Sequence, residues 1–152
     1  LSLHDALPIL KSNAPITRTF ESKKQKGAEV DLSSVFANSV KKVVRTVILD
    51  QKDHLEVTDR LETGDKEAAV SWIMVTPAEA KITGKNRMEL TKDGQRMLLT
   101  VDADTEVEMK TWSNVPPHEY DFRNPGTIRV GFETVIPANR ASQLKVRLIP
   151  LK

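Results

Sequence analysis

A short stretch near the C-terminus gathers the side chains best suited to hold a sugar. Trp112 ends a segment of alternating polarity, and His118, Tyr120 and Arg123 follow within the irregular stretch Ser113–Thr127. If this stretch is extended, His118 and Tyr120 project to the same side and offer two hydrogen-bonding groups. An exposed Trp112 ring would stack on a sugar ring. These residues are therefore candidate substrate-binding groups.

The same residues have a plainer interpretation. Long loops on a β scaffold either carry function or cover a sheet edge. In the second case Tyr120, the single tyrosine of the chain, packs inward. Trp112 then closes the end of the core, with its indole N–H bonded to a loop carbonyl. Both alternatives stay open at the level of sequence.

The sequence gives little support for a metal site, a covalent nucleophile or a cofactor. The chain has no cysteine, which excludes disulfides, thiolate metal sites and a cysteine nucleophile. His54 and His118 lack ligand spacing, so we expect no metal site and no cofactor. Asp102, Asp104 and Glu106 alternate along a strand without the loop geometry of a calcium site, and a solvated hairpin is the default interpretation. No phosphate loop, nucleophile elbow or zinc motif occurs, and no catalytic residue is assigned.

Size and charge narrow the class of protein. The chain has 152 residues, enough for one domain with its own core. Its net charge of +2 gives no argument for a nucleic-acid partner. No apolar run is long enough to cross a bilayer as a helix. The densest basic set is interpreted as a solvated, lysine-protected sheet edge, although it would also attract an anionic polysaccharide; it comprises Lys23, Lys24, Lys26, Lys41, Lys42 and Arg45.

Hydrophobic residues recur with a period of two, which predicts strands with one buried face. The alternating segments are His54–Leu61, Glu106–Trp112, Ile128–Ile136 and Leu144–Leu148. Three runs are more continuously apolar and are expected to lie centrally, with both faces at least partly covered; these are Val43–Leu49, Ala68–Val75 and the shorter Met97–Val101.

Turn residues separate these strands. Lys92–Gln95 contains Asp-Gly, the strongest signal for a two-residue type I′ hairpin. Only Ser33–Asn38 is compatible with a short helical turn. Strands at roughly ten-residue spacing predict an all-β fold, an antiparallel β-sandwich or jelly-roll-like structure with at most short helical turns. Asp59 falls on the apolar face of its strand, so we expect a buried ion pair, with Arg45 as the best partner.

The first residues look foreign to this fold. Leu1–Ile9 begins without methionine, lacks strand alternation and resembles a translated sequencing adapter. We therefore divide the chain into a foreign or disordered segment, 1–12, and a β-sandwich domain, 13–152. No intact signal peptide is present; if the protein is exported, we expect its signal to lie upstream.

The order of features within the domain resembles the C-terminal β-sandwich of heparinase II/III-like polysaccharide lyases. The matching elements are Val30-Asp31, Phe36, Val43-Val44-Arg45, Val57-Thr58-Asp59-Arg60 and the tryptophan-bearing Ser71-Trp72-Ile73. The resemblance implies a bacterial enzyme, periplasmic or secreted, in which an N-terminal (α/α) toroid binds an acidic polysaccharide and the β-sandwich packs against the toroid. Such enzymes cleave uronic-acid polymers by β-elimination, using a tyrosine and a histidine for general acid–base catalysis.

The resemblance assigns no catalytic residue to this chain. The expected role is therefore a non-catalytic domain that supports or flanks the substrate cleft of the lyase, with an exposed apolar patch where the toroid packs. Two alternatives are a stand-alone carbohydrate-binding module, which predicts an aromatic platform on a polar surface, and a purely structural sandwich.

Overall fold

The computed structural model describes residues 13–116, 118 and 123–152, and residues 1–12 of the expected foreign segment lie outside this part. No helix occurs among the described residues, and none of them forms a span long and apolar enough to cross a membrane as a helix. In the described part of the chain, eleven strands form two antiparallel sheets, which confirms the all-β sandwich. The strands are β1 Ile16–Glu21, β2 Gln25–Asp31, β3 Lys42–Asp50, β4 Leu55–Glu62, β5 Ala68–Thr76, β6 Glu79–Gly84, β7 Arg87–Lys92, β8 Gln95–Ala103, β9 Val107–Ser113, β10 Ile128–Ile136 and β11 Ala141–Leu151.

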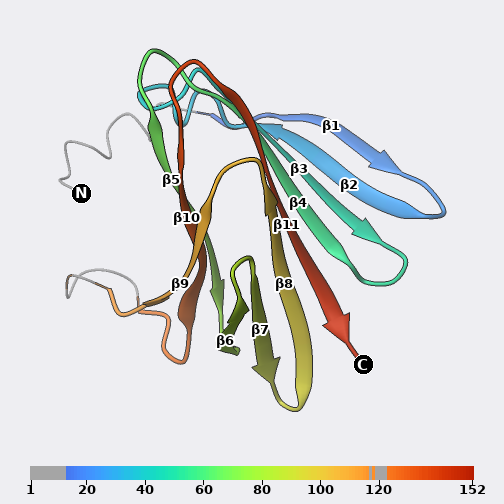
Figure 1. The fold of residues 1–152 in the computed structure, drawn as a ribbon. Coiled ribbons are helices and arrows are strands. Elements are labelled where there is room, and N and C mark those ends of the chain that lie inside the picture. Colours follow the sequence, from blue (N-terminus) through green and yellow to red (C-terminus); the bar gives the residue numbers. More distant parts are fainter. Residues whose placement is uncertain (1–12, 117, 119–122) are drawn as a thin grey trace.

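The two sheets are unequal in size. The large sheet has eight strands in the order β1-β2-β3-β4-β11-β8-β7-β6, and the small sheet has three in the order β5-β10-β9. Figure 1 shows the small sheet on one side of the molecule and the β1–β2 hairpin projecting away from it on the other. The small sheet therefore covers only part of the inner face of the large one.

The core lies between the sheets, where alternate residues of facing strands meet. Phe132 of β10 is fully buried and stacks on Trp72 of β5, with ring centroids 6.1 Å apart and an angle of 5° between the rings. Trp72 shares the inward face of β5 with Val70 and Met74, which pack against the same core. The other fully buried large side chains come from both sheets; they are Met88, Leu99, Val130, Ile136, Leu144 and Val146.

The turn chemistry is confirmed at the β7–β8 hairpin. Asp93 and Gly94 both have positive φ angles, 50° and 76°, and Lys92 pairs with Gln95 across the turn. This is the left-handed pair of residues that a type I′ turn requires. The Ser33–Asn38 segment contains hydrogen-bonded turns, such as Val35 N–H to Leu32 O at 3.0 Å, and not a helix.

One expectation about strand position is wrong. β3 and β8, which contain Val43–Leu49 and Met97–Val101, are interior strands as predicted. β5, which contains Ala68–Val75, is instead an edge strand of the small sheet. Its burial alternates along the strand, and Ile73 and Val75 are 44% and 51% exposed. A continuous apolar run does not by itself show that both faces are covered.

Candidate functional site

Trp112 lies on the outer face of the small sheet. Along β9 the side chains of Val107 and Met109 are buried in the core, so Glu108, Lys110 and Trp112 point outward. Trp112 stands directly opposite Arg129 of β10. A half-buried indole beside a guanidinium offers an apolar ring face and N–H donors at one place.

The charges beside this pair are fixed by a three-membered network. Lys110 Nζ lies 2.5 Å from Glu133 Oε2 of β10 and 3.0 Å from Glu108 Oε2 of its own strand. Hydrogen bonds from the Lys110 ammonium to Glu133 and Glu108 raise the pKa of that ammonium above its ordinary value. Arg129 Nε donates to the Ser113 carbonyl at 3.0 Å. Lys110 is therefore paired with carboxylates, whereas no carboxylate of the described residues pairs with the Arg129 guanidinium.

The remaining candidates belong to the connection between β9 and β10. His118 and Arg123 are both exposed, while Tyr120 lies outside the described residues. The structure therefore does not test the expected alignment of His118 with Tyr120. Asn114 and Thr127 close the base of the connection, with Asn114 Nδ2 donating to Thr127 Oγ1 at 2.7 Å. Arg123 thus lies on the connection itself, and Trp112 lies on β9, the strand that leads into it.

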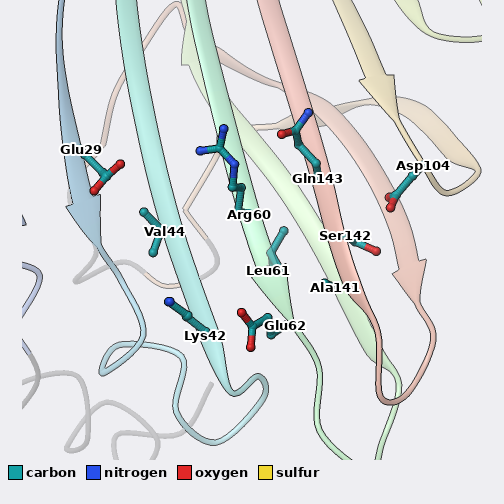
Figure 2. Close-up of a pocket in the computed structure, with 10 residues that line it drawn as sticks. All are labelled: Glu29, Lys42, Val44, Arg60, Leu61, Glu62, Asp104, Ala141, Ser142 and Gln143. Carbon is teal, nitrogen blue, oxygen red and sulfur yellow. The ribbon is translucent and has the colours of Figure 1, made fainter.

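A second hollow lies on the outer face of the large sheet. Figure 2 shows Arg60 extending across it above Val44, with Lys42 and Glu62 at one end. Its lining holds two cations and three carboxylates, the latter being Glu29, Glu62 and Asp104. An acidic polysaccharide would meet a carboxylate excess here, so this hollow is a poorer site for it than the face around Trp112.

A third feature, a cavity of about 440 Å³, opens where β5 faces β3 and β4. On its floor Asp59, whose side chain is 6% exposed, accepts two hydrogen bonds from Arg45, Nε to Oδ1 and Nη2 to Oδ2, both at 2.7 Å. The bond to Asp59 raises the pKa of Arg45 above its already high ordinary value. The expected buried ion pair is thereby confirmed.

Sequence reasoning missed the cavity itself. Its wall is mostly apolar and includes Phe36, Val40, Val43, Val70 and Trp72. The buried indole Nε1 of Trp72 has no hydrogen-bond partner among the described residues. The one signal in the sequence was Asp59, a carboxylate at an apolar position.

Metal-binding geometry is absent from the described residues: no group of three or more His, Asp or Glu side chains is placed to hold an ion. The acidic residues of the β8–β9 connection have other partners. Glu106 Oε1 lies 3.0 Å from Lys85 Nζ, and Asp104 accepts an ion-pair contact at 3.7 Å from Arg140. The hydrogen bond from Lys85 lowers the pKa of Glu106.

These features define an all-β sandwich with one face on which a half-buried tryptophan stands beside an arginine. Its fold is similar to that of part of several solved structures. One titled heparinase III superimposes with a TM-score of 0.67 at 12% identity, covering 91% of this chain and 21% of that one. A second heparinase III structure gives 0.66 at 14% identity. The heparan sulfate lyase HepC from Pedobacter heparinus gives 0.61 at 15% identity, over 92% of this chain and 22% of that one.

The chain thus spans about a fifth of the length of these solved proteins. At such identities the likeness establishes a shared fold. No protein-family model matches the sequence, and no curated protein matches it. The predicted likeness to the heparinase II/III β-sandwich is confirmed at the level of structure.

Proposed function

We propose that this chain is the C-terminal β-sandwich domain of a polysaccharide lyase that acts on uronic-acid polymers by β-elimination. The observation that carries the proposal is the match of 91% of the chain to a heparinase III structure, at a TM-score of 0.67. The domain comprises residues 13–152, and the segment 1–12 is foreign to it. An N-terminal (α/α) toroid in the longer protein supplies the catalytic groups.

In this proposal the domain is non-catalytic and flanks the substrate cleft. β-Elimination needs a base for the proton α to the uronate carboxylate and an acid for the leaving oxygen. On the outer face of the small sheet, the one ammonium beside Trp112, that of Lys110, is held by Glu108 and Glu133 and is not free to act as a base. The domain therefore contributes binding, and its partner contributes proton transfer.

The binding surface is the face around Trp112, completed by the connection that carries His118, Tyr120 and Arg123. A pyranose ring would stack on the indole, while Arg129 would pair with a carboxylate or sulfate of the same polymer. Bidentate pairing with a planar guanidinium favours such groups over neutral sugars. This arrangement also suits the second candidate, a stand-alone carbohydrate-binding module, because Trp112 lies on the solvent side of its sheet.

Two assays separate the roles. The chain alone, incubated with heparan sulfate or alginate, should give no rise in ultraviolet absorbance from unsaturated uronides; measurable lyase activity would refute the non-catalytic role. Affinity electrophoresis on the same glycans should show retardation that falls about tenfold in Trp112→Ala, the effect of losing one stacking contact of 1–2 kcal/mol. The matched control is Val115→Ala, which removes a 78% exposed apolar side chain from the same connection. Equal retardation of the two variants would remove Trp112 from the binding surface.

We further propose a periplasmic or secreted location in a bacterium. Acidic polysaccharides are large and charged, so a lyase that degrades them must meet them outside the cytoplasmic membrane. Fractionation of cells expressing the longer protein under its own export signal tests this, and recovery with the cytoplasmic fraction would contradict it.

A further inference from the structure

The open edge of β5 differs from the other sheet edges. β5 has the sequence AAVSWIMVT, nine residues without a charge, and it pairs with β10 in unbroken register from Ala68 to Thr76. Natural edge strands are normally protected by charges, bulges or short length. β9, the opposite edge of the same sheet, carries Glu108 and Lys110.

The edges of the large sheet are protected in the same way. β1 carries Arg18 and has a register shift between Ile16 and Arg18. β6 carries Lys81 and has a register shift between Ile82 and Gly84. Among the described strands, β5 alone presents a long, regular and uncharged edge, which is the kind of edge that accepts another strand.

There is room for such a strand beside β5. The cavity of about 440 Å³ lies between this edge and β3, and the β1–β2 hairpin extends beyond it (Figure 1). The cavity wall includes Phe36, which is 47% exposed, and Val70. It also holds Trp72, 7% exposed, whose indole N–H has no partner within the described part of the chain. Apolar surface and an unsatisfied donor are both costly to leave in place, and both are relieved by a polypeptide carrying apolar side chains and carbonyl oxygens.

We propose that the edge of β5 receives an additional β-strand from the part of the longer protein outside this chain. The strand is uncharged where it meets β5. Its inward side chains fill the cavity against Phe36 and Val70, and one of its oxygens accepts the Trp72 N–H. The source of the strand rests on the proposed function, since the matched solved protein is about four times as long as this chain.

The position of the first described residues supports this source. Ser34 Oγ donates to the Asn13 carbonyl, and Asp31 N–H donates to the Pro15 carbonyl at 3.0 Å. Ser34 belongs to the turn that carries Phe36, whereas Asp31 ends β2. Polypeptide that precedes Asn13 in a longer protein therefore arrives beside the turn that supplies Leu32, Phe36 and Val40 to the cavity wall.

A second copy of this chain fits the edge poorly. Antiparallel pairing of two β5 strands would bring the two large sheets to the same side of the joined small sheets. Each large sheet extends past its β5 edge through β1 and β2, so the two hairpins would occupy the same space (Figure 1). A single strand avoids this collision.

The test uses the chain alone, by nuclear magnetic resonance and analytical ultracentrifugation. The probe is a short peptide of alternating valine and threonine with a lysine at each end. Titration should shift the backbone amides of β5 and leave those of β9 unchanged. The variant Ala69→Lys places a charge on the edge and should weaken binding about tenfold. The matched control is Val135→Lys, because Val135 stands directly opposite Ala69 on the same face but on the central strand; its affinity should stay within about twofold of the wild type.

Three results would overturn the proposal. These are absence of β5 shifts, equal weakening by the two lysine variants, and a dimer of the chain with protected β5 amides, which would assign the edge to a second copy. Thermal melts of both variants show whether each remains folded. The peptide titration and the ultracentrifugation involve no glycan. The strand site can therefore be refuted while the lyase proposal stands, and the lyase proposal can be refuted while the strand site stands.

Discussion

Removing either member of the Arg45–Asp59 pair should destabilise the fold, but by unequal amounts. Breaking a fully buried pair costs about 3–5 kcal/mol because an uncompensated charge stays inside. Here the side chain of Asp59 is 6% exposed and that of Arg45 is 38% exposed. Arg45→Met traps a carboxylate that water barely reaches, and we expect a loss of about 3 kcal/mol at neutral pH. Asp59→Asn leaves a guanidinium that can turn toward solvent, and we expect a loss of only about 1 kcal/mol.

The double variant completes the cycle. Arg45→Met combined with Asp59→Asn should lie within about 1 kcal/mol of Asp59→Asn alone, because no buried carboxylate then remains for Arg45 to pair with. Urea unfolding followed by tryptophan fluorescence provides the measurement, because Trp72, one of the two tryptophans, is stacked in the core on Phe132. With an m-value of about 1.5–2 kcal/mol/M, a loss of 3 kcal/mol lowers the midpoint by about 1.5–2 M.

The relative stability losses of the two single variants show which of the two charges requires a partner. If Asp59→Asn costs more than Arg45→Met, the buried carboxylate is not the group that requires a partner. If the two losses add in the double variant, the pair is not energetically coupled, since contacting charges should give a coupling energy of at least about 1 kcal/mol. Either result would refute the account of this pair given above.

Two further predictions concern stability. Gly131→Ala should cost more than about 3 kcal/mol or prevent folding, because an added Cβ would lie 1.9 Å from the Trp72 carbonyl oxygen; a melting temperature within a few degrees of the wild type would contradict this. Burial raises the pKa of Glu56, but Arg147 and Lys145 outweigh it, so the pKa lies below its ordinary value. Stability from this carboxylate is present above the unfolded-state pKa of about 4.3 and is lost as pH falls through the lower folded-state value. Glu56→Gln should therefore flatten the acid limb of a stability–pH profile, and an unchanged limb would count against it.

Much of the local structure could be predicted because it depends on neighbours in sequence. Alternation placed Val57 and Asp59 on one face of β4, and a carboxylate at an apolar position required a cation across the strand pair. Arg45 is directly paired with Asp59 in the register of β3 and β4. The Asp93-Gly94 dipeptide specified its own turn, since few other residues adopt positive φ at two successive positions.

The sheet order could not be predicted in the same way. β4 pairs with β11, some eighty residues later in the chain, and no periodicity within either strand encodes that contact. The apolar run of β5 shows the consequence. Ile73 and Val75 suggested cover on both faces, yet they lie exposed on an edge strand, because which strands stand beside a run is decided by the whole chain. The cavity beside β5 was missed for the same reason.

The two sides of the small sheet differ in a way that suits a domain bordering a cleft. β9 presents Trp112 with charged neighbours, whereas β5 presents apolar side chains and an uncharged edge. The two strands flank β10, so at about 4.8 Å between neighbouring strands they stand about 10 Å apart. A sugar bound at Trp112 would then lie three strand spacings, about 14 Å, from a polypeptide docked along β5. Catalytic groups in that polypeptide could reach a polymer held by this face without any of them belonging to the sandwich, which is why we expect binding to reside in this chain and proton transfer in its partner.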